Sequence, residues 1–405
     1  MKKIIFVNRY FYPDHSATSQ LLTDLAFDLS TNGHAVVVIT SRQLYDRASA
    51  RLPAVECVNN VRILRAASTG FGRSNLLGRA FDYVSFYWSS LVLLAREIKH
   101  GDILVVKTDP PLLSLFASLL GRVKGAKFIN WVQDIFPEIA VSLGVKVFPP
   151  GINGLVLKWR DRSWRQAWKN VVLGERMKKF LCSHGVDCGR IAIIPNWSDG
   201  GLIYPVDRQD NGLASEWDLE GRFVVGYSGN LGRAHDFETL LGAARLLREE
   251  KRIAFLFIGA GAQIDRLKHI VVEDNLDNVL FKPYQPREKL AESLSVPDVH
   301  IISLLPELEG MIVPSKFYGV AAAGRPSIYI GDEQGEIPLL LEKYACGYAV
   351  SPGGSERLSD IISRLSLDAQ VCREAGMNAR RLFEQYYDKP IALQSWSRLI
   401  ACATV

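Results

Sequence analysis

Apolar residues occur along the first half of the chain in short continuous runs, separated by longer segments with helical spacing. Ile4–Asn8 and Ala35–Thr40 are two such runs. Between them, Ser19–Asn32 places leucines at the three- and four-residue intervals of an amphipathic helix, followed by Gly33. Continuous β-branched runs that alternate with helices are typical of parallel strands covered on both faces. The pattern therefore predicts a doubly wound α/β sheet.

The same rhythm begins again after residue 220. Arg222–Ser228, Ile253–Ile258 and Val299–Leu304 are predicted strands, each followed by a helical segment. The other predicted strands are Val61–Arg65, Ile103–Lys107, Lys127–Val132, Val279–Phe281 and Pro326–Ile330. The segment from Asn196 to Glu220 lacks periodicity and is rich in Gly, Asp and Asn, which indicates a linker.

These patterns predict an α/β protein with two doubly wound Rossmann-like domains that face a cleft. We expect an N-terminal domain at residues 1–200 and a C-terminal domain at residues 201–385. The last helix, at about residues 386–405, is amphipathic and is expected to fold back onto the first domain.

Composition supports a globular protein. The chain has 405 residues, of which 48% are hydrophobic and 22% are charged, so extended disorder is excluded. No apolar run reaches the ~20 residues of a spanning helix, and the start of the chain resembles a buried strand more than a signal peptide. The six scattered cysteines predict reduced thiols and a cytoplasmic protein.

The net charge of +5 is modest, but basic residues concentrate between Leu155 and Phe180. That stretch also holds Trp159, Trp164 and Trp168, and Phe81–Leu94 is similarly aromatic. Tryptophan beside Lys and Arg favours binding to an anionic membrane surface. The alternative is that Trp164 and Trp168 belong to the core and the charges form a solvated face. Nucleic-acid binding is disfavoured, because the pI of about 8.8 is moderate.

Two loops of the second half have the composition of phosphate-binding turns. Gly226–Arg233 follows a strand and precedes a helix, so its glycines permit close backbone approach and Arg233 supplies a permanent cation. Gly259 to Gly261 repeats the glycine pattern after the next strand. Ordinary βα turns with a surface arginine are the alternative for both loops.

A third loop runs from Glu307 to Lys316. Pro314 and Ser315 are typical of a helix start, which places Lys316 in the first helical turn, where a cation is unfavourable to the helix dipole. A lysine at that position is explained by a bound phosphate, and a solvated loop is the alternative. Glu309, seven residues earlier, can accept hydrogen bonds from sugar hydroxyls.

At these residues the sequence resembles glycosyltransferase family 4, the retaining transferases with the GT-B fold. The resemblance extends over most of the chain through Gly33–Val36, Trp131–Glu138, Ile194–Trp197, Gly226–Gly232 and Ala323–Pro326. Within that family it is most similar to bacterial enzymes that build surface polysaccharides, such as lipopolysaccharide O-antigen or capsule.

The resemblance implies a set of site residues. Glu309 and Asp134 would be the catalytic residues, and Arg233 with Lys316 would hold the donor diphosphate. The implied donor-binding residues are Gly229, Asn230, Arg233, Gly259, Phe281, Tyr284, Val313, Pro314, Ser315, Lys316 and Glu336. Phe281 to Tyr284 would flank the nucleotide base, and His15, Ser16 and Thr18 are the acceptor-side candidates.

The chain departs from the family pattern in three places. The second glutamate of the family motif is replaced by Phe317 or Gly319, depending on the alignment, and Glu336 is the candidate substitute at the nucleotide ribose. The usual glycine pair after the first strand is absent, and residues 14–19 stand there instead. Gln133 precedes Asp134 where relatives often have histidine.

The predicted function is retaining, metal-independent transfer of a sugar from a nucleotide sugar. The expected acceptor is a polyprenyl-diphosphate-linked glycan or a polysaccharide, and no cofactor or metal is expected. The enzyme would be cytoplasmic and peripheral on the inner face of the cytoplasmic membrane. Two alternatives remain, an enzyme similar to nucleotide-sugar 2-epimerases and a non-catalytic GT-B subunit.

Overall fold

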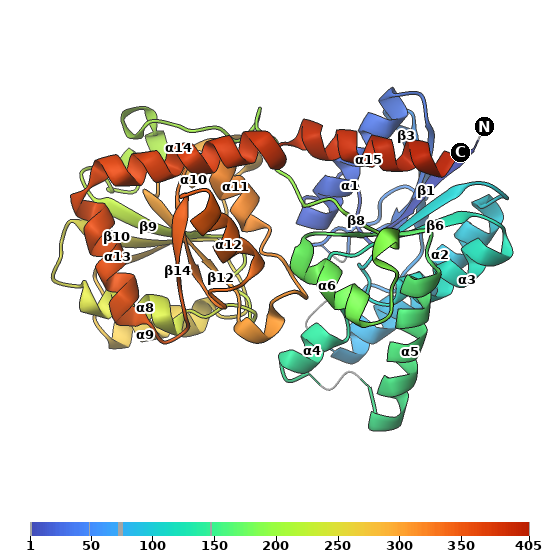
Figure 1. Cartoon of the computed structure of the whole chain (residues 1–405), viewed down its shortest axis with the longest axis horizontal. Coiled ribbons are helices and arrows are strands. Elements are labelled where there is room, and N and C mark those ends of the chain that lie inside the picture. Colours follow the sequence, from blue (N-terminus) through green and yellow to red (C-terminus); the bar gives the residue numbers. More distant parts are fainter. Residues whose placement is uncertain (1, 48, 72–75, 146–147, 405) are drawn as a thin grey trace. The chain divides into compact units, whose positions relative to one another are not determined.

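The computed structural model describes residues 2–47, 49–71, 76–145 and 148–404. The chain forms two compact units (Figure 1). The N-terminal unit comprises Met1–Pro195 together with Leu393–Val405, and the C-terminal unit comprises Asn196–Ala392. The predicted linker, Asn196 to Glu220, is therefore part of the C-terminal unit, where it forms the short helices η2 (Arg208–Asp210) and α7 (Gly212–Glu216).

The N-terminal unit is built on an eight-stranded sheet in the order β3-β4-β2-β1-β5-β6-β7-β8. Every pair in it is parallel except β3 with β4. β1 and β5 are buried on both faces, as their continuous apolar runs predict. The strands are β1 (Lys3–Val7), β2 (Ala35–Ser41), β3 (Val55–Val58), β4 (Val61–Ala66), β5 (Ile103–Lys107), β6 (Lys127–Trp131), β7 (Lys169–Val172) and β8 (Ile191–Ile193).

Helices cover both faces of this sheet (Figure 1). One apolar core joins the inner side of α2 and α3 to β1, β2, β4 and β5, and it includes Phe86, Leu94 and Leu113. The helices are α1 (Ala17–Thr31), α2 (Leu76–Glu97), α3 (Leu113–Val123), α4 (Glu138–Ser142), α5 (Pro150–Gln166), α6 (Glu175–Ser183) and the 3-10 turn η1 (Cys188–Arg190).

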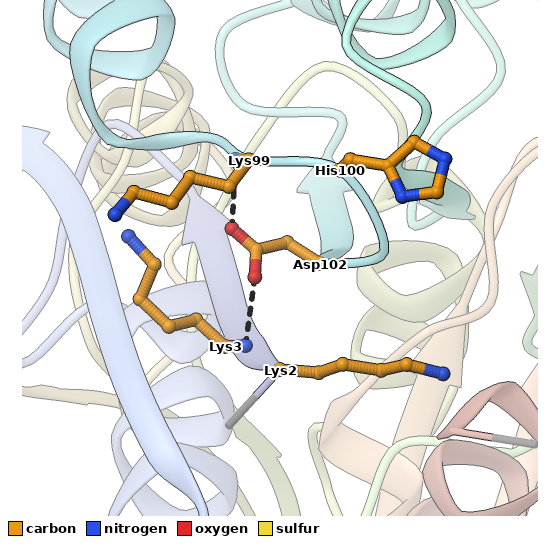
Figure 2. A pocket seen from close by; sticks show the side chains of 5 residues that line it. All are labelled: Lys2, Lys3, Lys99, His100 and Asp102. Atoms are coloured by element: carbon orange, nitrogen blue, oxygen red, sulfur yellow. Dashed lines mark hydrogen bonds between the residues drawn. The ribbon is translucent and has the colours of Figure 1, made fainter.

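Asp102 ties the starts of β1 and β5 at the amino edge of the sheet (Figure 2). Its two carboxylate oxygens accept hydrogen bonds from the backbone N–H of Lys3 at 2.9 Å and of Lys99 at 2.8 Å. Lys2, Lys3, Lys99 and His100 surround this carboxylate in a shallow pocket. The cluster is explained by strand alignment, because both oxygens of Asp102 accept from backbone groups.

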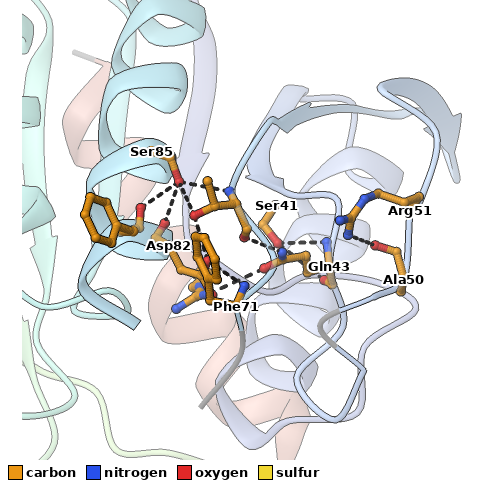
Figure 3. Close-up of polar contacts among 10 residues, drawn as sticks. Ser41, Gln43, Ala50, Arg51, Phe71, Asp82 and Ser85 are labelled. Carbon is orange, nitrogen blue, oxygen red and sulfur yellow. Dashed lines mark hydrogen bonds and ion pairs between the residues drawn. The ribbon is translucent and has the colours of Figure 1, made fainter. Parts of the chain in front are cut away.

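The segment that leads into α2 is fastened to that helix by side chains (Figure 3). Asp82, which is fully buried, accepts hydrogen bonds from the Thr69 hydroxyl at 2.7 Å and from the Phe71 N–H at 3.1 Å. The Gln43 amide donates to the Thr69 carbonyl at 2.6 Å. These bonds hold Phe71 beside Phe81 of α2, with ring centroids 6.2 Å apart.

The C-terminal unit has a six-stranded, wholly parallel sheet in the order β11-β10-β9-β12-β13-β14. The chain winds outward from β9 in one direction and from β12 in the other, so the switch point lies between these two strands. Ligands of doubly wound folds bind at such a point, beyond the carboxyl ends of the strands. The strands are β9 (Phe223–Ser228), β10 (Ile253–Ile258), β11 (Val279–Lys282), β12 (Val299–Ser303), β13 (Ser327–Ile330) and β14 (Gly347–Val350).

The helices of this unit all bury apolar side chains, and the larger of the two cores described in it includes Phe237, Leu267 and Leu358. They are α8 (Glu238–Leu246), α9 (Ile264–Glu273), α10 (Leu290–Ser295), α11 (Lys316–Ala322), α12 (Glu336–Lys343), α13 (Ser355–Leu367) and α14 (Ala369–Tyr386), with 3-10 turns η3 (Arg287–Lys289) and η4 (Pro306–Leu308). The predicted strands and helices agree with these within a few residues.

The last helix, α15 (Lys389–Thr404), begins in the C-terminal unit and continues into the N-terminal one. Trp396, Ile400 and Ala403 are fully buried there. The Trp396 ring lies 4.6 Å from that of Trp131 at the end of β6. These contacts make α15 an integral part of the N-terminal unit.

Three sequence predictions need correction. β3, β7, β8 and β14 were not predicted, because each has only three or four residues and no long apolar run. The basic stretch Leu155–Phe180 is not one surface element, since it comprises most of α5, the buried β7 and part of α6. Cys182 and Cys188 are joined in a disulfide, whereas free thiols were expected. The 3-10 turn at residues 188–190 brings their Cα atoms to 5.7 Å.

Candidate functional site

The carboxyl ends of β9 and β12 place two phosphate-binding candidates next to each other in the C-terminal unit. Gly229 follows β9, with φ +129, and a Cβ at this position would lie 3.9 Å from Nζ of Lys316. Lys316 begins α11, the helix that follows β12. The prediction that these two loops share one site therefore agrees with the geometry.

Lys316 is held by an aromatic ring rather than by a carboxylate. Its Nζ lies 3.7 Å from the ring centroid of Tyr227 and donates a hydrogen bond to the Tyr227 hydroxyl. Within the described ranges, no carboxylate oxygen lies within ion-pair distance of this amine. Desolvation lowers the pKa of Lys316 to about 7. A bound anion would stabilise the charged form and raise that pKa.

His235 lies on the other side of Tyr227 and is fixed in its neutral form. Its Nδ1 hydrogen-bonds the Ser303 carbonyl at 2.6 Å, and its ring meets Tyr227 edge-on at 5.9 Å. Burial, and then the nearby Lys316 charge, lower the pKa of His235 to about 3. The sequence reasoning did not assign Tyr227 or His235 to the site, since their roles depend on contacts between strands.

The second glycine loop has a structural explanation. A Cβ on Gly259 would lie 2.1 Å from the Gly229 carbonyl oxygen, and one on Gly261 would lie 2.5 Å from that of Leu231. The two loops are joined by hydrogen bonds from Gly229 N to the Ile258 carbonyl and from Leu231 N to the Ala260 carbonyl, both 2.9 Å. Gly259 therefore shapes the site by letting the β10 loop support the β9 loop.

Glu309 is oriented by two donors from its own unit. One carboxylate oxygen accepts from the backbone N–H of Glu336 at 2.8 Å, and the other accepts from the Tyr329 hydroxyl at 3.1 Å. Desolvation raises the pKa of Glu309. The first bond brings Glu336, at the start of α12, directly beside Glu309. Two glutamates thus lie together here although the family spacing is absent from the sequence.

Neither position of the missing glutamate is open to a ligand. Phe317 is 1% exposed. A Cβ on Gly319 would point toward Leu294 and Ser198, at 3.4 and 3.8 Å. Glu336 is therefore the better placed carboxylate, although its predicted contact with the ribose stays a prediction.

The remaining donor-side candidates differ in exposure. Asn230, Arg233 and Ser315 are exposed, and Tyr284 is 55% exposed beside Gly259. Phe281 does not project from the loop, because its ring stacks on Phe257 at 5.1 Å at the edge of the core. Val313 and Pro314 are buried beneath the start of α11.

In the N-terminal unit the switch point lies between β1 and β5. Asp134 follows β6 nearby, and its backbone N–H donates to the Thr108 hydroxyl at 3.3 Å. Desolvation by the surrounding protein raises the pKa of Asp134 to about 6, with a smaller effect of Asp109, although the side chain remains exposed to solvent.

Lys107, at the end of β5, is a buried cation that the sequence reasoning missed. It is 1% exposed, its Nζ donates to the Thr18 carbonyl at 2.9 Å, and it lies 3.8 Å over the Trp131 ring. Burial lowers the pKa of Lys107 to about 7, against the opposing effect of Asp109 and Asp134. Its position explains how the first turn of α1 is held to the ends of β5 and β6.

The acceptor-side candidates at the start of α1 are only partly free. The Ser16 hydroxyl and N–H both donate to Asp14, at 2.5 and 2.8 Å. Thr18 uses its carbonyl to bind Lys107. His15 is exposed, and its carbonyl accepts from Gln20 at 2.6 Å. Asp14, absent from the prediction, is thus the residue that shapes this loop.

The depressed pKa of Lys107 predicts a pH-dependent stability. Its folded pKa of about 7 lies below its ordinary value of 10.5, so the unfolded chain binds the proton more readily between these values. The free energy of unfolding should therefore rise with pH, by about 2 kcal/mol between pH 7 and pH 9. Urea denaturation of Lys107→Met should show a rise that is smaller by this amount, because the similar contribution of Lys316 remains, and exposed Lys99→Met should retain the full rise. An equal pH dependence in all three proteins would contradict the prediction.

Among the residues that the structure describes, no group of three or more His, Cys, Asp or Glu side chains is arranged to hold a metal ion. The described helices also include none that is long and apolar enough to span a membrane.

Residues 214–382, which form most of the C-terminal unit, match the family model described as glycosyl transferases group 1. With its two Rossmann-like units the chain has the architecture of the GT-B fold, and this match over the C-terminal unit supports a glycosyltransferase function. The match agrees with the resemblance that the sequence indicated.

Named relatives extend the similarity over most of the chain. It is 28% identical over 336 residues to the probable glycosyltransferase WbjE of Pseudomonas aeruginosa, covering 82% of each protein. It is 26% identical over 371 residues to the putative colanic acid biosynthesis glycosyl transferase WcaI of Escherichia coli K12, covering 88% of this chain and 90% of that one. The structure of Anabaena HepE in complex with UDP-glucose shares the fold, with a TM-score of 0.73, 14% identity and coverage of 99% and 100%.

Proposed function

We propose that this enzyme is a retaining glycosyltransferase of surface-polysaccharide synthesis that uses a nucleotide-sugar donor and a lipid-linked glycan acceptor. The similarity to WbjE and WcaI supports the biosynthetic role, and the UDP-glucose complex of HepE supports the donor class. A lipid-linked acceptor requires the enzyme to work at a membrane surface. We include a cytoplasmic, peripheral location in the proposal.

One observation carries the donor assignment. At the switch point between β9 and β12, the Lys316 amine lies beside Gly229, held by an aromatic face and without a carboxylate partner in the described chain. A half-buried lysine of lowered pKa at this position is poorly stabilised until an anion binds. The exposed guanidinium of Arg233, in the loop after Gly229, adds a second cation for the same diphosphate.

The proposed reaction breaks the bond between the anomeric carbon and the diphosphate oxygen. Lys316 and Arg233 neutralise the charge that develops on the leaving diphosphate, which is the role a metal ion plays in other transferases. The acceptor hydroxyl attacks the anomeric carbon from the face that the diphosphate leaves. Because attack takes place on that face, the configuration is retained, and the hydroxyl proton passes to a leaving phosphate oxygen.

The two carboxylates have separate proposed roles. Glu309, oriented by Tyr329 and the Glu336 N–H, accepts hydrogen bonds from the transferred sugar through its remaining lone pairs. Asp134 contacts the acceptor from the N-terminal unit. Glu336 takes the place of the missing glutamate at the ribose.

The geometry disfavours an epimerase. That reaction requires acid–base residues near the sugar, and His235 is excluded from this role at neutral pH because its pKa is lowered to about 3. A non-catalytic subunit would bind nucleotide sugars without releasing nucleoside diphosphate from them.

Thermal-shift screening tests the proposal. UDP-, GDP-, ADP- and dTDP-sugars should be added in turn to the full chain, and the donor should raise the melting temperature in proportion to its binding. Lys316→Ala should reduce that shift. NMR of the product formed with a lipid-linked acceptor should then show the anomeric configuration of the donor. No shift with any of these nucleotide sugars, or an inverted product, would contradict the proposal.

A further inference from the structure

Three neighbouring helices of the N-terminal unit each expose large apolar side chains in the same register. The exposed residues are Phe81, Val84 and Trp88 on α2, Phe116, Leu119 and Val123 on α3, and Ile152, Leu155 and Trp159 on α5. In each helix they are spaced i, i+3 and i+7, which places them on one stripe. We call these nine residues the apolar face.

The stripes lie on the outer side of helices that already have a buried side. α2 buries Phe86 and Leu94, α3 buries Leu113 and Ala117, and α5 buries Trp164. The outward stripes therefore cannot be explained by the core of this unit. Trp88 is 74% exposed and Val123 is 73% exposed. Single exposed apolar residues are common on protein surfaces, but stripes on three adjacent helices are typical of an interaction site.

The three helices form one continuous layer. α3 packs against α2 and also against α5. Tyr87 of α2 meets Phe116 of α3 with ring centroids 6.3 Å apart. Phe71, 61% exposed, extends the layer beside Phe81. The described helices of the C-terminal unit differ, because their exposed apolar residues, such as Leu246, Val272 and Leu367, do not form such stripes.

The charges around this layer have one sign. Exposed basic residues of the layer are Arg96, Arg122, Lys124, Lys158, Arg162 and Arg165. The helices α2, α3 and α5 contain three carboxylates, and none of them is exposed. Asp82 is buried, Glu97 pairs with Lys3 and Arg62, and Asp161 pairs with Arg160. Among the described residues of these three helices, the surface thus presents apolar and cationic groups and no exposed carboxylate.

We propose that the apolar face is the surface by which this enzyme docks onto an anionic lipid bilayer. Aromatic and aliphatic side chains would enter the headgroup boundary while Lys158 and Arg162, one turn along from the α5 stripe, contact lipid phosphates. A second copy of the chain fits less well, because a two-fold contact through this face would bring its basic residues together. This proposal rests on the proposed function in one respect: a lipid-linked acceptor requires the enzyme to dock onto a membrane.

The surface differs from the one that the sequence suggested. Trp164 is 3% exposed and its ring lies beneath the Arg160 guanidinium at 4.0 Å, so it belongs to the core. Trp168 is half-buried. Of the three tryptophans in the basic stretch, Trp159 alone is exposed, and it joins Trp88 from a helix about 70 residues earlier in the sequence.

Vesicle flotation of the full chain tests the proposal. Wild type should float with vesicles of phosphatidylcholine and phosphatidylglycerol, and binding should fall in high salt or with phosphatidylcholine alone. Val84→Ser/Trp88→Ser/Leu119→Ser should weaken partitioning at least about tenfold. Lys158→Glu/Arg162→Glu should weaken it on anionic vesicles. The matched control Leu246→Ser/Val272→Ser/Leu367→Ser should bind as wild type does.

Nucleotide-sugar thermal shifts on the same variants separate this proposal from the proposed function. Variants of the apolar face should keep the donor-induced shift and a wild-type melting temperature while losing vesicle binding. Wild type that stays in the soluble fraction at low salt would overturn the membrane proposal without affecting the donor assignment. A triple serine variant that still floats with vesicles would overturn it as well. So would a change from dimer to monomer in that variant, because this result would assign the apolar face to contact with a second copy of the chain.

Discussion

Replacement of Lys316 by alanine should reduce the rate of sugar transfer by about 10²–10³-fold, the usual effect of removing one group that stabilises transition-state charge. The amine is held over the Tyr227 ring and beside Gly229, at the carboxyl end of β9. Steady-state kinetics with the identified donor should show a fall in kcat as well as weaker donor binding.

The pH dependence of donor binding distinguishes this role from a structural one. Since the pKa of Lys316 is about 7 without a ligand, wild-type affinity for nucleoside diphosphate should fall as the pH rises above 7. The alanine variant should lack that dependence. Lys316→Arg should recover part of the activity, because charge is kept while the geometry changes. Unchanged turnover and unchanged donor affinity in Lys316→Ala would refute the assignment.

Replacement of Glu309 by glutamine should lower kcat by about 100-fold with little change in nucleoside diphosphate affinity. The amide has nearly the size of the carboxylate, but one of its two acceptor atoms becomes a donor. That change conflicts with Tyr329 or with the Glu336 N–H, and it removes a charge that can bind sugar hydroxyls.

Tyr329→Phe is the matched control for Glu309. It removes the hydrogen bond to one carboxylate oxygen and leaves the charge and the Glu336 bond in place. We expect a much smaller fall in kcat than in Glu309→Gln, measured with the same donor and acceptor. Equal losses in both variants would show that Glu309 acts through the position of its loop and not at the sugar.

Much of the fold could be predicted, because each of the longer strands is specified by an apolar run within its own segment of the sequence. β1, β2 and β10 are continuous apolar runs, and their burial on both faces follows from that pattern. The family resemblance implied that the loops after β9 and β12 bind one diphosphate, and the two strands are neighbours in the sheet. β7 was not predicted, because it has four residues and begins with Lys169 in a basic stretch, so it has no long apolar run.

The site was less predictable where one residue acts on another far away in sequence. The bond between Glu309 and the Glu336 N–H joins two loops 27 residues apart, and no spacing rule anticipates it. Tyr227 was not predicted as a site residue, because it lies within a strand, although its ring contacts the Lys316 amine. The apolar face was only partly anticipated, because stripes on three helices become one surface only after folding.

Helix α15 has a consequence for the order in which the protein is made. The N-terminal unit needs Leu393–Val405, and the fully buried Trp396 covers Trp131, over which the Lys107 amine lies. The ribosome synthesises these residues after the C-terminal unit. The nascent N-terminal unit therefore cannot complete its core before the whole C-terminal unit has been synthesised.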